Sequence, residues 1–163
     1  MRRLSPQTGG GGLCEDEWMS EINSAAAVTI RPLGLEQSEA ATRLWEEAGL
    51  TRSWNPPAED FARAVGGATS AVLGAFDGDE LVGTAMVGYD GHRGWIYYLA
   101  VAGARRGSGL GRQLNDAAEE WMRERDVPKV QLMVRSTNAG VVDFYERLGY
   151  EDGEVVVLGK WLR

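Results

Sequence analysis

The clearest chemistry in the sequence belongs to a segment rich in glycine and arginine, residues 99–112. Its residues are, in order, Leu99, Ala100, Val101, Ala102, Gly103, Ala104, Arg105, Arg106, Gly107, Ser108, Gly109, Leu110, Gly111 and Arg112. The glycines leave backbone N–H groups accessible at the start of an expected helix, where the helix dipole also favours anions. Residues 102–113 hold three arginines and no acid, in a chain whose formal charge is −7. The segment therefore predicts a phosphate-binding loop, and an ordinary glycine-rich turn is the alternative.

Two familiar nucleotide-binding loops fit this segment poorly. A Walker loop places Lys and then Ser or Thr after its last glycine, but Arg112 occupies that position. The dinucleotide fingerprint is G-x-G-x-x-G, whereas Gly107, Gly109 and Gly111 give G-x-G-x-G. A Rossmann unit also starts from a parallel β-α-β arrangement, and antiparallel strands are expected before this segment. A nucleotide-binding protein is therefore the disfavoured interpretation.

A second motif, residues 138–150, follows further along the chain. Its residues are Asn138, Ala139, Gly140, Val141, Val142, Asp143, Phe144, Tyr145, Glu146, Arg147, Leu148, Gly149 and Tyr150. This motif resembles the second signature of the GNAT superfamily of N-acetyltransferases. The first segment, as Arg106-x-x-Gly109-x-Gly111 after a strand that ends at Val101, resembles the coenzyme A loop of the same family. Both motifs occur at the separation that is typical of the family.

The resemblance spans about residues 27–160 and includes the expected order of elements. It implies an acetyl-CoA-dependent N-acetyltransferase, with acetyl-CoA as co-substrate and no metal. The co-substrate-binding residues that it implies are Leu99, Ala100, Val101, Arg106, Gly107, Ser108, Gly109, Leu110, Gly111, Arg112 and Asn138. In the family the strand backbone pairs with the pantetheine arm, and the loop amides surround the diphosphate. Trp54-Asn55 together with residues 89–94 is similar to the bacterial YpeA-type branch.

Two residues of the second motif have roles implied by the resemblance. The Tyr145 hydroxyl matches the group that protonates the departing thiolate, which makes Tyr145 the implied catalytic residue. Asn138 matches the residue that contacts the co-substrate. Each residue also has a simpler interpretation. Asn138 is a common helix N-cap type, and Tyr145 can be a core aromatic like its neighbour Phe144.

The implied reaction is direct attack of a neutral amine on the thioester carbonyl within a ternary complex. It needs an oxyanion donor, which the family takes from backbone N–H on the fourth strand, and a general base for the ammonium. Many relatives place Glu near the position of Trp95, but this sequence has no acid in residues 93–113. The candidates that remain are Asp90, Glu80, His92 and, by holding a water molecule, Tyr98. Each also has an ordinary interpretation as a turn, surface or core residue.

The acceptor side is weakly specified by the sequence. In the family it is shaped by the loop between the first two helices and by the hairpin of the third and fourth strands. The corresponding residues here are Arg52, Trp54, Asn55, Asp90, His92 and Arg93. Their mixed charges do not distinguish a peptide N-terminus, a lysine or a small amine, and Trp54 can instead close the core. A non-catalytic acyl-CoA-binding or regulatory module is the second function class, favoured by the missing acid and opposed by Tyr145.

An α/β (α+β) fold must position these residues, and hydrophobic spacing predicts its elements. The expected strands are residues 28–30, 71–76, 81–87, 95–101, 130–134 and 155–158. The expected helices are residues 41–48, a short helix after Pro56 with Glu59 and Asp60 in its first turn, residues 110–122 and residues 141–148. Asp77-Gly78 marks a hairpin. Together with the resemblance, this predicts a GNAT-type mixed, mostly antiparallel twisted sheet of about six to seven strands flanked by four helices.

Composition sets the broad class of the protein. The chain has 163 residues, 44% apolar and 25% charged, which predicts one domain over residues 27–163. Gly9–Gly12 and the lack of an apolar period predict a disordered tail over residues 1–26. The excess of acid argues against nucleic-acid and anionic-membrane partners, and no run approaches the length of a membrane span. Cys14 is the single cysteine and His92 the single histidine, which fits a reducing cytoplasm and gives no zinc cluster. The expected partner is a small-molecule or peptide amine, and a homodimer is left open.

Overall fold

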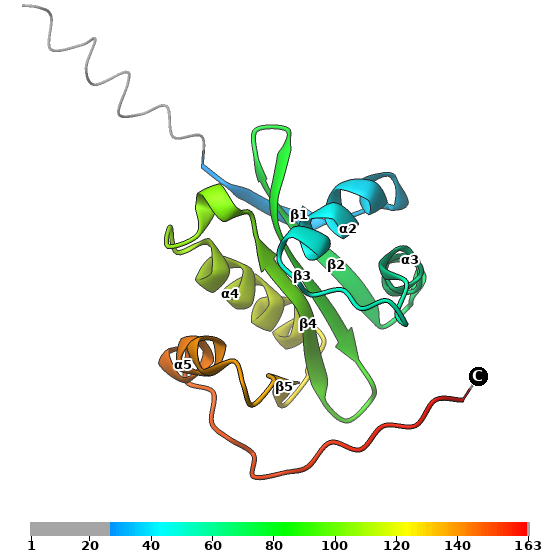
Figure 1. Ribbon diagram of the computed structural model, residues 1–163, viewed down its shortest axis with the longest axis vertical. Coiled ribbons are helices and arrows are strands. Elements are labelled where there is room, and N and C mark those ends of the chain that lie inside the picture. The colour runs from blue at the N-terminus through cyan, green and yellow to red at the C-terminus, as the bar shows by residue number, and fades with distance from the viewer. Residues whose placement is uncertain (1–26, 163) are drawn as a thin grey trace, which may run out of the picture.

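The computed structural model of the protein describes residues 27–162. The predicted disordered tail over residues 1–26, with Cys14, lies outside the described residues. The chain forms a mixed α/β fold in which helices lie on both faces of one twisted sheet (Figure 1). No helix within residues 27–162 is long and apolar enough to cross a membrane. The same residues contain no group of three or more His, Cys, Asp or Glu side chains that could hold a metal ion.

The four predicted helices are confirmed. They are α2 (Ser38–Glu47), α3 (Pro57–Gly66), α4 (Leu110–Arg123) and α5 (Ala139–Arg147), and two 3-10 turns are η1 (Leu35–Gln37) and η2 (Gly103–Arg105). The strands are β1 (Thr29–Pro32), β2 (Ser70–Asp77), β3 (Glu80–Tyr89), β4 (Gly94–Val101) and β5 (Val130–Leu132). Pro57 opens α3, with Glu59 and Asp60 in its first turn, as predicted. Gly49 follows α2 with a φ of 70°, the left-handed conformation expected after a helix end.

The strands lie in the order β1-β2-β3-β4-β5. Neighbouring strands are antiparallel, except that β4 and β5 run parallel. The hairpin predicted at Asp77-Gly78 is confirmed, because Asp77 pairs with Glu80 and Gly78 has a φ of 60°. A parallel pair needs a crossover connection, and α4 supplies it between β4 and β5.

The core has an apolar layer on each face of the sheet. On one face α2 and α3 pack on the sheet through Ala41, Leu44, Trp45, Phe61, Ala64, Val72, Phe76, Met86 and Ala100. On the other face α4 contributes Leu110, Leu114, Ala118, Trp121 and Met122. Burial on both faces explains why β2 and β3 are near-continuous apolar runs. This packing holds α3 over one face and the start of α4 over the other.

Among the described residues the sheet has five strands, and the prediction of six to seven is wrong because residues 155–158 form no strand. The side chains from Val155 to Leu158 are 63–89% exposed. Valines favour strands, but a strand forms only where a neighbour completes the hydrogen-bond ladder. Here the C-terminal segment runs past the end of the sheet instead of along β5 (Figure 1). As a result β5 is an edge strand.

Candidate active site

Halfway along its length, β4 separates from β5 and forms a bulge in its pairing with β3. It pairs with β5 only over Gly94–Ile96. On its other side the register with β3 shifts between Tyr97 and Ala100, so β4 contains one extra residue there, a β-bulge. Beyond Ile96, the edge of β4 that faces away from β3 therefore has no strand partner among the described residues.

This open edge carries the predicted pantetheine-binding residues. Ala102 N–H donates to the Val82 carbonyl on β3 at 2.9 Å. Because peptide groups alternate along a strand, those of Val101 and Leu99 face the open edge. Ala100 pairs with Thr84 on β3 and its side chain is buried in the core, so it lies between the two residues that face the edge. The edge can pair with an extended chain that contains amides.

Tyr98 lies at the bulge with a φ of 48°, a left-handed conformation that is strained for a tyrosine. Two hydrogen bonds from the core hold it there. Trp45 Nε1 donates to Thr84 Oγ1 at 2.8 Å, and Thr84 Oγ1 donates to the Tyr98 carbonyl at 3.1 Å. Trp45 and Thr84 are both fully buried. Core packing therefore imposes the conformation that interrupts β4.

The predicted phosphate-binding loop connects β4 to α4. Gly107 and Gly109 have φ values of 76° and 84°, and nothing lies within 4 Å of a Cβ placed on either. The first helical bond of α4 runs from Gln113 N–H to the Gly109 carbonyl at 3.2 Å. The N–H groups of residues 110–112 therefore have no partner within the helix. They are free donors at the positive end of the helix dipole, which is the arrangement of an anion site.

The three arginines of the loop have different surroundings. Arg105 forms an ion pair with Asp77 at the end of β2, so its charge is already neutralised. Arg106 and Arg112 are exposed and form no ion pair with another described residue. The Ser108 hydroxyl donates to the Arg105 carbonyl at 2.6 Å and so holds the loop together. Two of the three cations thus remain available to a ligand.

The second motif forms α5 and the turn before it. Asn138 is the N-cap residue, but its exposed side chain makes no capping hydrogen bond, so the helix-cap interpretation of that side chain is wrong. The ring of Tyr145 is 8% exposed and makes edge contacts with Phe144 at 5.0 Å and with Tyr150 at 5.3 Å, between ring centroids. Burial raises the pKa of the Tyr145 hydroxyl to about 12, so this group keeps its proton at neutral pH.

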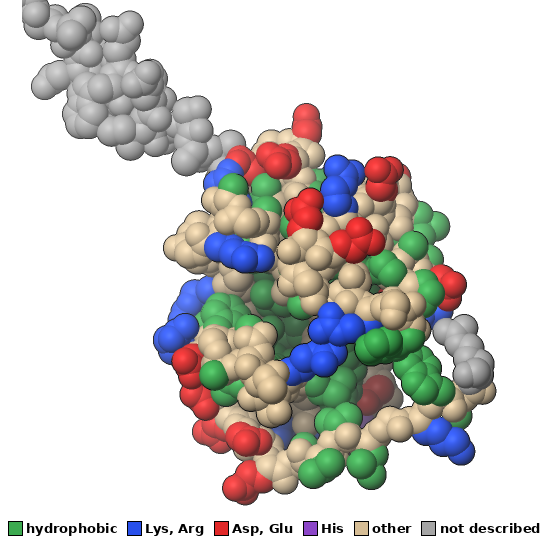
Figure 2. Space-filling view, viewed as in Figure 1, with side chains coloured by type: hydrophobic (Ala, Val, Ile, Leu, Met, Phe, Trp, Pro, Cys, Tyr) green, Lys and Arg blue, Asp and Glu red, His purple; other side chains and the backbone are tan. Residues whose placement is uncertain are grey.

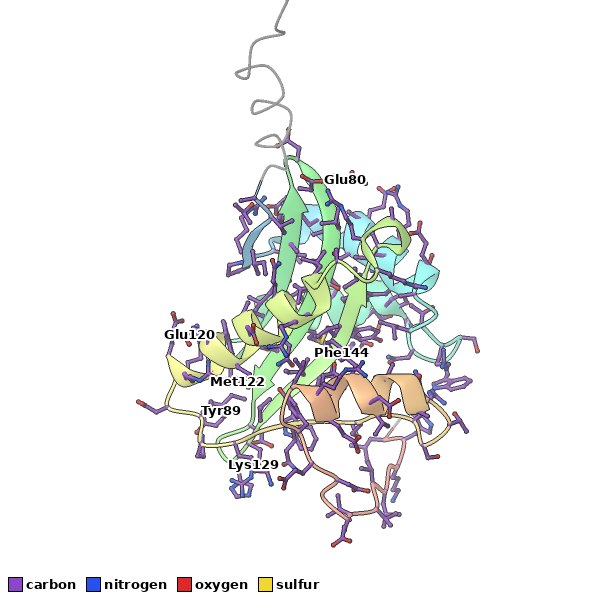
Figure 3. The ribbon with its side chains drawn as sticks, turned by 90° about the vertical axis from the view of Figure 1, so that its left-hand side faces the viewer. Glu80, Tyr89, Glu120, Met122, Lys129 and Phe144 are labelled. Carbon is purple, nitrogen blue, oxygen red and sulfur yellow. The ribbon has the colours of Figure 1, made fainter. Side chains whose placement is uncertain are left out.

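Aromatic side chains dock α5 against α4 beside the loop. A Cβ placed on Gly111 would lie 3.4 Å from Phe144 Cζ, so the two segments approach closely there. The Tyr150 hydroxyl lies 3.1 Å from both Asn115 Oδ1 and Glu119 Oε1 on α4. Figure 3 shows Phe144 on the side of α5 that faces α4. The fold therefore brings the two sequence motifs together.

A cavity of about 750 Å³ opens on the α3 side of β4. The space-filling view shows the surface hollowed between the body of the domain and the C-terminal segment (Figure 2). The charged side chains that line the cavity are Asp60, Arg63 and Arg135, and Met86 and Met133 are among the apolar ones. None of the predicted co-substrate-binding residues is among its lining residues. The cavity is therefore separate from the phosphate-binding loop. Both adjoin β4, because Tyr97 and Tyr98 line the cavity and the loop follows the end of this strand.

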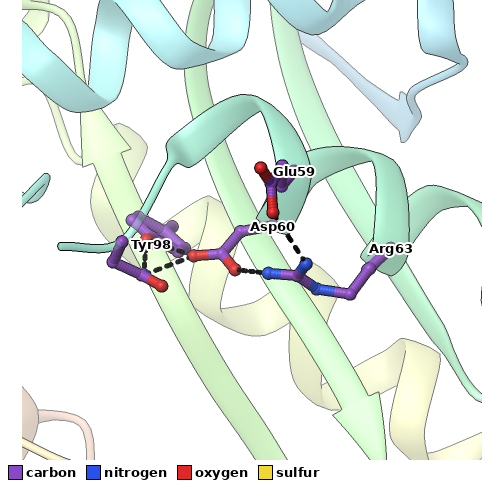
Figure 4. Close-up of polar contacts among 5 residues, drawn as sticks. Glu59, Asp60, Arg63 and Tyr98 are labelled. Carbon is purple, nitrogen blue, oxygen red and sulfur yellow. Dashed lines mark hydrogen bonds and ion pairs between the residues drawn. The ribbon is translucent and has the colours of Figure 1, made fainter. Parts of the chain in front are cut away.

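Asp60 is the acid in this cavity, and the sequence assigned it only to the first turn of α3. Its Oδ2 accepts hydrogen bonds from the Tyr98 hydroxyl at 2.9 Å and from Asn55 Nδ2, and its Oδ1 accepts from Arg63 (Figure 4). Asn55 Nδ2 also donates to the Tyr98 oxygen at 3.0 Å. Burial, followed by the bond to Asp60, raises the pKa of Tyr98 to about 12. Asp60 and Tyr98 are 38 residues apart, so no local spacing reveals the pair.

Most residues predicted to line the acceptor side lie elsewhere. Of that set, only Asn55 lines the cavity. Trp54 is 63% exposed and lines a separate hollow with Trp161, so it does not close the core. Arg52 donates to the Gly49 carbonyl at 3.0 Å within its own loop. Arg52 is therefore held by its own loop, and Trp54 faces a different hollow.

The predicted base candidates Asp90, His92 and Glu80 do not line the cavity either. Asp90 accepts from the backbone N–H groups of Arg93 at 2.7 Å and His92 at 2.8 Å, and from the Trp95 indole at 3.1 Å. These bonds, that of Arg93 first, lower the pKa of Asp90 to about 2, which makes it a poor proton acceptor. Glu80 is exposed at the far end of the β2–β3 hairpin (Figure 3). Asp90 and Glu80 are therefore a turn acid and a surface acid.

Comparison with known proteins was consistent with this geometry. The acetyltransferase (GNAT) family matches residues 37–150. An aminoglycoside acetyltransferase from an uncultured soil metagenomic sample, in complex with trehalose, has 20% identity and a TM-score of 0.69, with 83% of this chain and 97% of that chain covered. AAC(6')-Iy, in complex with the bisubstrate analogue CoA-S-monomethyl-acetylneamine, has 16% identity and a TM-score of 0.71, with 82% and 97% covered. Glucosamine-6-phosphate N-acetyltransferase from Arabidopsis thaliana has 17% identity and a TM-score of 0.65, with 84% and 99% covered.

The interrupted strand, the loop at the start of α4 and the docked α5 define an acetyltransferase-type domain. The family match covers more than half of the chain, so the chain belongs to the GNAT family of acetyltransferases. The solved structures share its mixed α/β fold. The substrates in their names belong to those proteins, because a shared fold does not fix the substrate.

Proposed function

We propose that the protein is an acetyl-CoA-dependent N-acetyltransferase that acts on a primary amine by direct attack within a ternary complex. The observation that carries this proposal is the interrupted β4. The backbone amides of its open edge and of the loop after it can bind a phosphorylated chain that itself contains amides. Tyr97 and Tyr98 on the same strand line a cavity that also contains an acid. Two ligands can therefore meet at one strand. The YpeA-type branch and a cytoplasmic location stay predictions from the sequence.

In this proposal the loop and the open strand edge hold the co-substrate. The free N–H groups of residues 110–112 and the unpaired guanidinium groups of Arg106 and Arg112 bind the diphosphate. Leu99 and Val101 pair through their backbone with the pantetheine arm, with Ala100 between them. The Asn138 side chain, which is not used for capping, contacts the co-substrate where α5 begins.

The transfer step then follows from the groups around β4. The amine nitrogen attacks the thioester carbonyl, the C–N bond forms and the C–S bond breaks. Backbone N–H groups on β4 stabilise the oxyanion that develops on the carbonyl oxygen. The Tyr145 hydroxyl, which stays protonated because its pKa is about 12, gives its proton to the departing thiolate. The attacking nitrogen loses one proton as the amide forms, and this proton replaces the one that Tyr145 gave up.

The charges in the cavity favour an acceptor with one cationic group. Asp60 is already paired with Arg63, and Arg135 lines the cavity without an ion-pair partner among the described residues. A polycation such as an aminoglycoside would therefore meet uncompensated positive charge. Met86 and Met133 suit the hydrocarbon part of a monoamine.

An amine panel with acetyl-CoA and thiol-release detection tests the proposed function. The panel contains a small monoamine, an Nα-acetyl-lysine, a short peptide with a free N-terminus and kanamycin. Turnover of any amine excludes the non-catalytic module, and acetyl-CoA binding without turnover on a broad panel would favour it. We expect kcat/KM for the best monoamine to exceed that for kanamycin by about tenfold or more, because of the charge in the cavity.

We also propose that the protein forms a homodimer through its C-terminal segment. The apolar side chains of Val155–Leu158, Trp161 and Leu162 are 63–92% exposed, which is unusual for an isolated domain. Within residues 27–162, one edge of β5 also has no partner strand. A second copy offers the complementary partner, because the segment of each copy can extend the β5 edge of the other in a symmetric exchange.

A further inference from the structure

The proposed transfer needs a group that removes a proton from the acceptor ammonium, because only the neutral amine is a nucleophile. Of the acids that the sequence suggested, Asp90 is bound to the β3–β4 turn and Glu80 lies at the far end of a hairpin. Asp60 is the one acid among the described residues that line the cavity. Asp60 is therefore the candidate for the final proton acceptor.

The surroundings of Asp60 keep its carboxylate fixed. The side chain is 17% exposed, and it accepts hydrogen bonds from Tyr98, Asn55 and Arg63. A carboxylate has about four acceptor positions, so these three donors orient it and do not saturate it. Arg63 also pairs with Glu59 at 3.4 Å, so its guanidinium is shared between two carboxylates.

Tyr98 connects this carboxylate to the cavity. Its hydroxyl donates to Asp60 Oδ2 at 2.9 Å and accepts from Asn55 Nδ2 at 3.0 Å. A hydroxyl oxygen has two lone pairs, so one remains for a ligand. The bulge and the stacking of the Tyr98 ring on Trp45, with centroids 4.0 Å apart, fix where this oxygen lies. Tyr98 also belongs to β4, the strand at which the thioester is expected.

Resting on the proposed function, we infer that Tyr98 and Asp60 form a proton relay that receives the acceptor amine. The ammonium donates a hydrogen bond to the free lone pair of Tyr98. One N–H bond then breaks as its proton moves to the Tyr98 oxygen, and the Tyr98 proton moves to Asp60 Oδ2. The products of this step are a neutral amine, a neutral Tyr98 and a neutral Asp60, and the Asp60 proton returns to solvent when the product leaves.

Two physical points support this assignment. The bound ligands exclude water, which disfavours the charged forms of both the ammonium and the carboxylate. Proton transfer is therefore favoured, because it converts this ion pair into two neutral groups. Tyr98 has a pKa of about 12 and does not itself ionise near neutral pH, so it passes a proton only by giving up its own in the same step. In the relay Asn55 and Arg63 are positioning residues, because they hold Asp60 and Tyr98 in place.

The test compares the pH dependence of kcat/KM for the wild type, Asp60→Asn and Tyr98→Phe on a good monoamine. Each variant should lose roughly 10²–10³-fold near pH 7, where the amine is protonated and needs the relay. The loss should shrink above about pH 10, where an alkylamine is already neutral. Glu39→Gln, which removes the exposed ion pair with Arg43 on α2, is the matched control and should follow the wild type. Acetyl-CoA affinity, measured by calorimetry, should stay within about twofold in all variants, since the relay lies outside the loop.

A loss that is equal at every pH, or a wild-type profile in either variant, would overturn the relay while leaving the proposed function intact. Tyr98→Phe keeps the aromatic ring that stacks on Trp45. This variant therefore tests the relay even if Asp60→Asn does not fold. A wild-type protein that binds acetyl-CoA but acetylates no amine would instead overturn the proposed function, and the relay with it.

Discussion

The indole ring of Trp45 stacks on the ring of Tyr98, with centroids 4.0 Å apart and planes within 14° of parallel. Trp45 is fully buried on α2, whereas Tyr98 interrupts β4 in a left-handed conformation. Thr84 joins the same two residues through a hydrogen bond to each. The helix layer on this face of the sheet therefore controls the geometry of the strand on which the proposed site is built.

Thr84→Val tests this control. The substitution leaves the buried Trp45 indole and the Tyr98 carbonyl without their partner, which should lower the free energy of unfolding by about 1–3 kcal/mol. Chemical denaturation measures the change. Thr42→Val is the control, because the Thr42 hydroxyl bonds only to carbonyls of its own helix, and it should stay within about 0.5 kcal/mol of the wild type. Equal stability of the two variants would show that the buried bonds do not hold the bulge.

Gly109→Asp tests the phosphate-binding loop. It places a carboxylate beside the expected diphosphate, so acetyl-CoA affinity should fall by about tenfold or more. The backbone strain at a φ of 84° adds a stability cost of about 1–2 kcal/mol. Gly78→Asp, at a φ of 60° in the β2–β3 turn, has a similar strain but lies in the hairpin turn. Calorimetric titration should show reduced affinity only for Gly109→Asp; unchanged affinity there would remove the loop from the co-substrate site.

Tyr145→Phe tests the leaving-group acid. The ring and its contacts with Phe144 and Tyr150 remain, and only the proton donor is lost. Turnover should fall by roughly 10²–10⁴, in kcat and kcat/KM alike, with little change in acetyl-CoA affinity. Tyr150→Phe removes a hydroxyl that bonds to α4 and should reduce stability more than turnover. Near wild-type turnover of Tyr145→Phe on a good amine would refute the role of its hydroxyl.

Asp90→Ala tests whether Asp90 stabilises the β3–β4 turn or acts as the general base. The folded pKa of about 2 lies below the usual 3.8, so Asp90 stabilises the protein above about pH 4 and stops doing so as the pH falls through 2. The difference in Tm between the wild type and the variant should therefore be present at pH 7 and shrink toward pH 2. Turnover at neutral pH should remain within about twofold. Asp79→Ala, in the β2–β3 turn, is the control; a large loss of turnover in Asp90→Ala alone would restore Asp90 as a candidate base.

Leu158→Asp tests the proposed homodimer. A charge in the exposed apolar segment should disfavour its burial against a second copy, so light scattering after gel filtration should shift from dimer to monomer. Lys160→Ala, in the same segment, should leave the mass unchanged. A wild-type protein that is monomeric at all accessible concentrations would contradict the dimer.

The sequence by itself determined the features that depend on near neighbours along the chain. Gly107, Gly109 and Gly111 could be assigned to an anion-binding turn because backbone freedom and the start of a helix are local properties. The four helices and the Asp77-Gly78 hairpin follow from spacing and turn chemistry for the same reason. The second motif gave the position of Tyr145 on α5, but the depth of its burial came only from packing against Phe144 and Tyr150.

The tertiary structure alone decided which residues line the candidate acceptor cavity. Asp60 has an ordinary helix-start position in the sequence, and only the packing of α3 over the sheet brings it to Tyr98, 38 residues away. Asp90 has the chemistry of a base, but three local donors bind it in a turn. Residues 155–158 have the composition of a strand, yet a strand needs a partner, and in the part of the chain that the structure describes they have none. The sequence gives the type of each side chain. Which side chains lie close together depends on contacts between residues that are distant in the sequence.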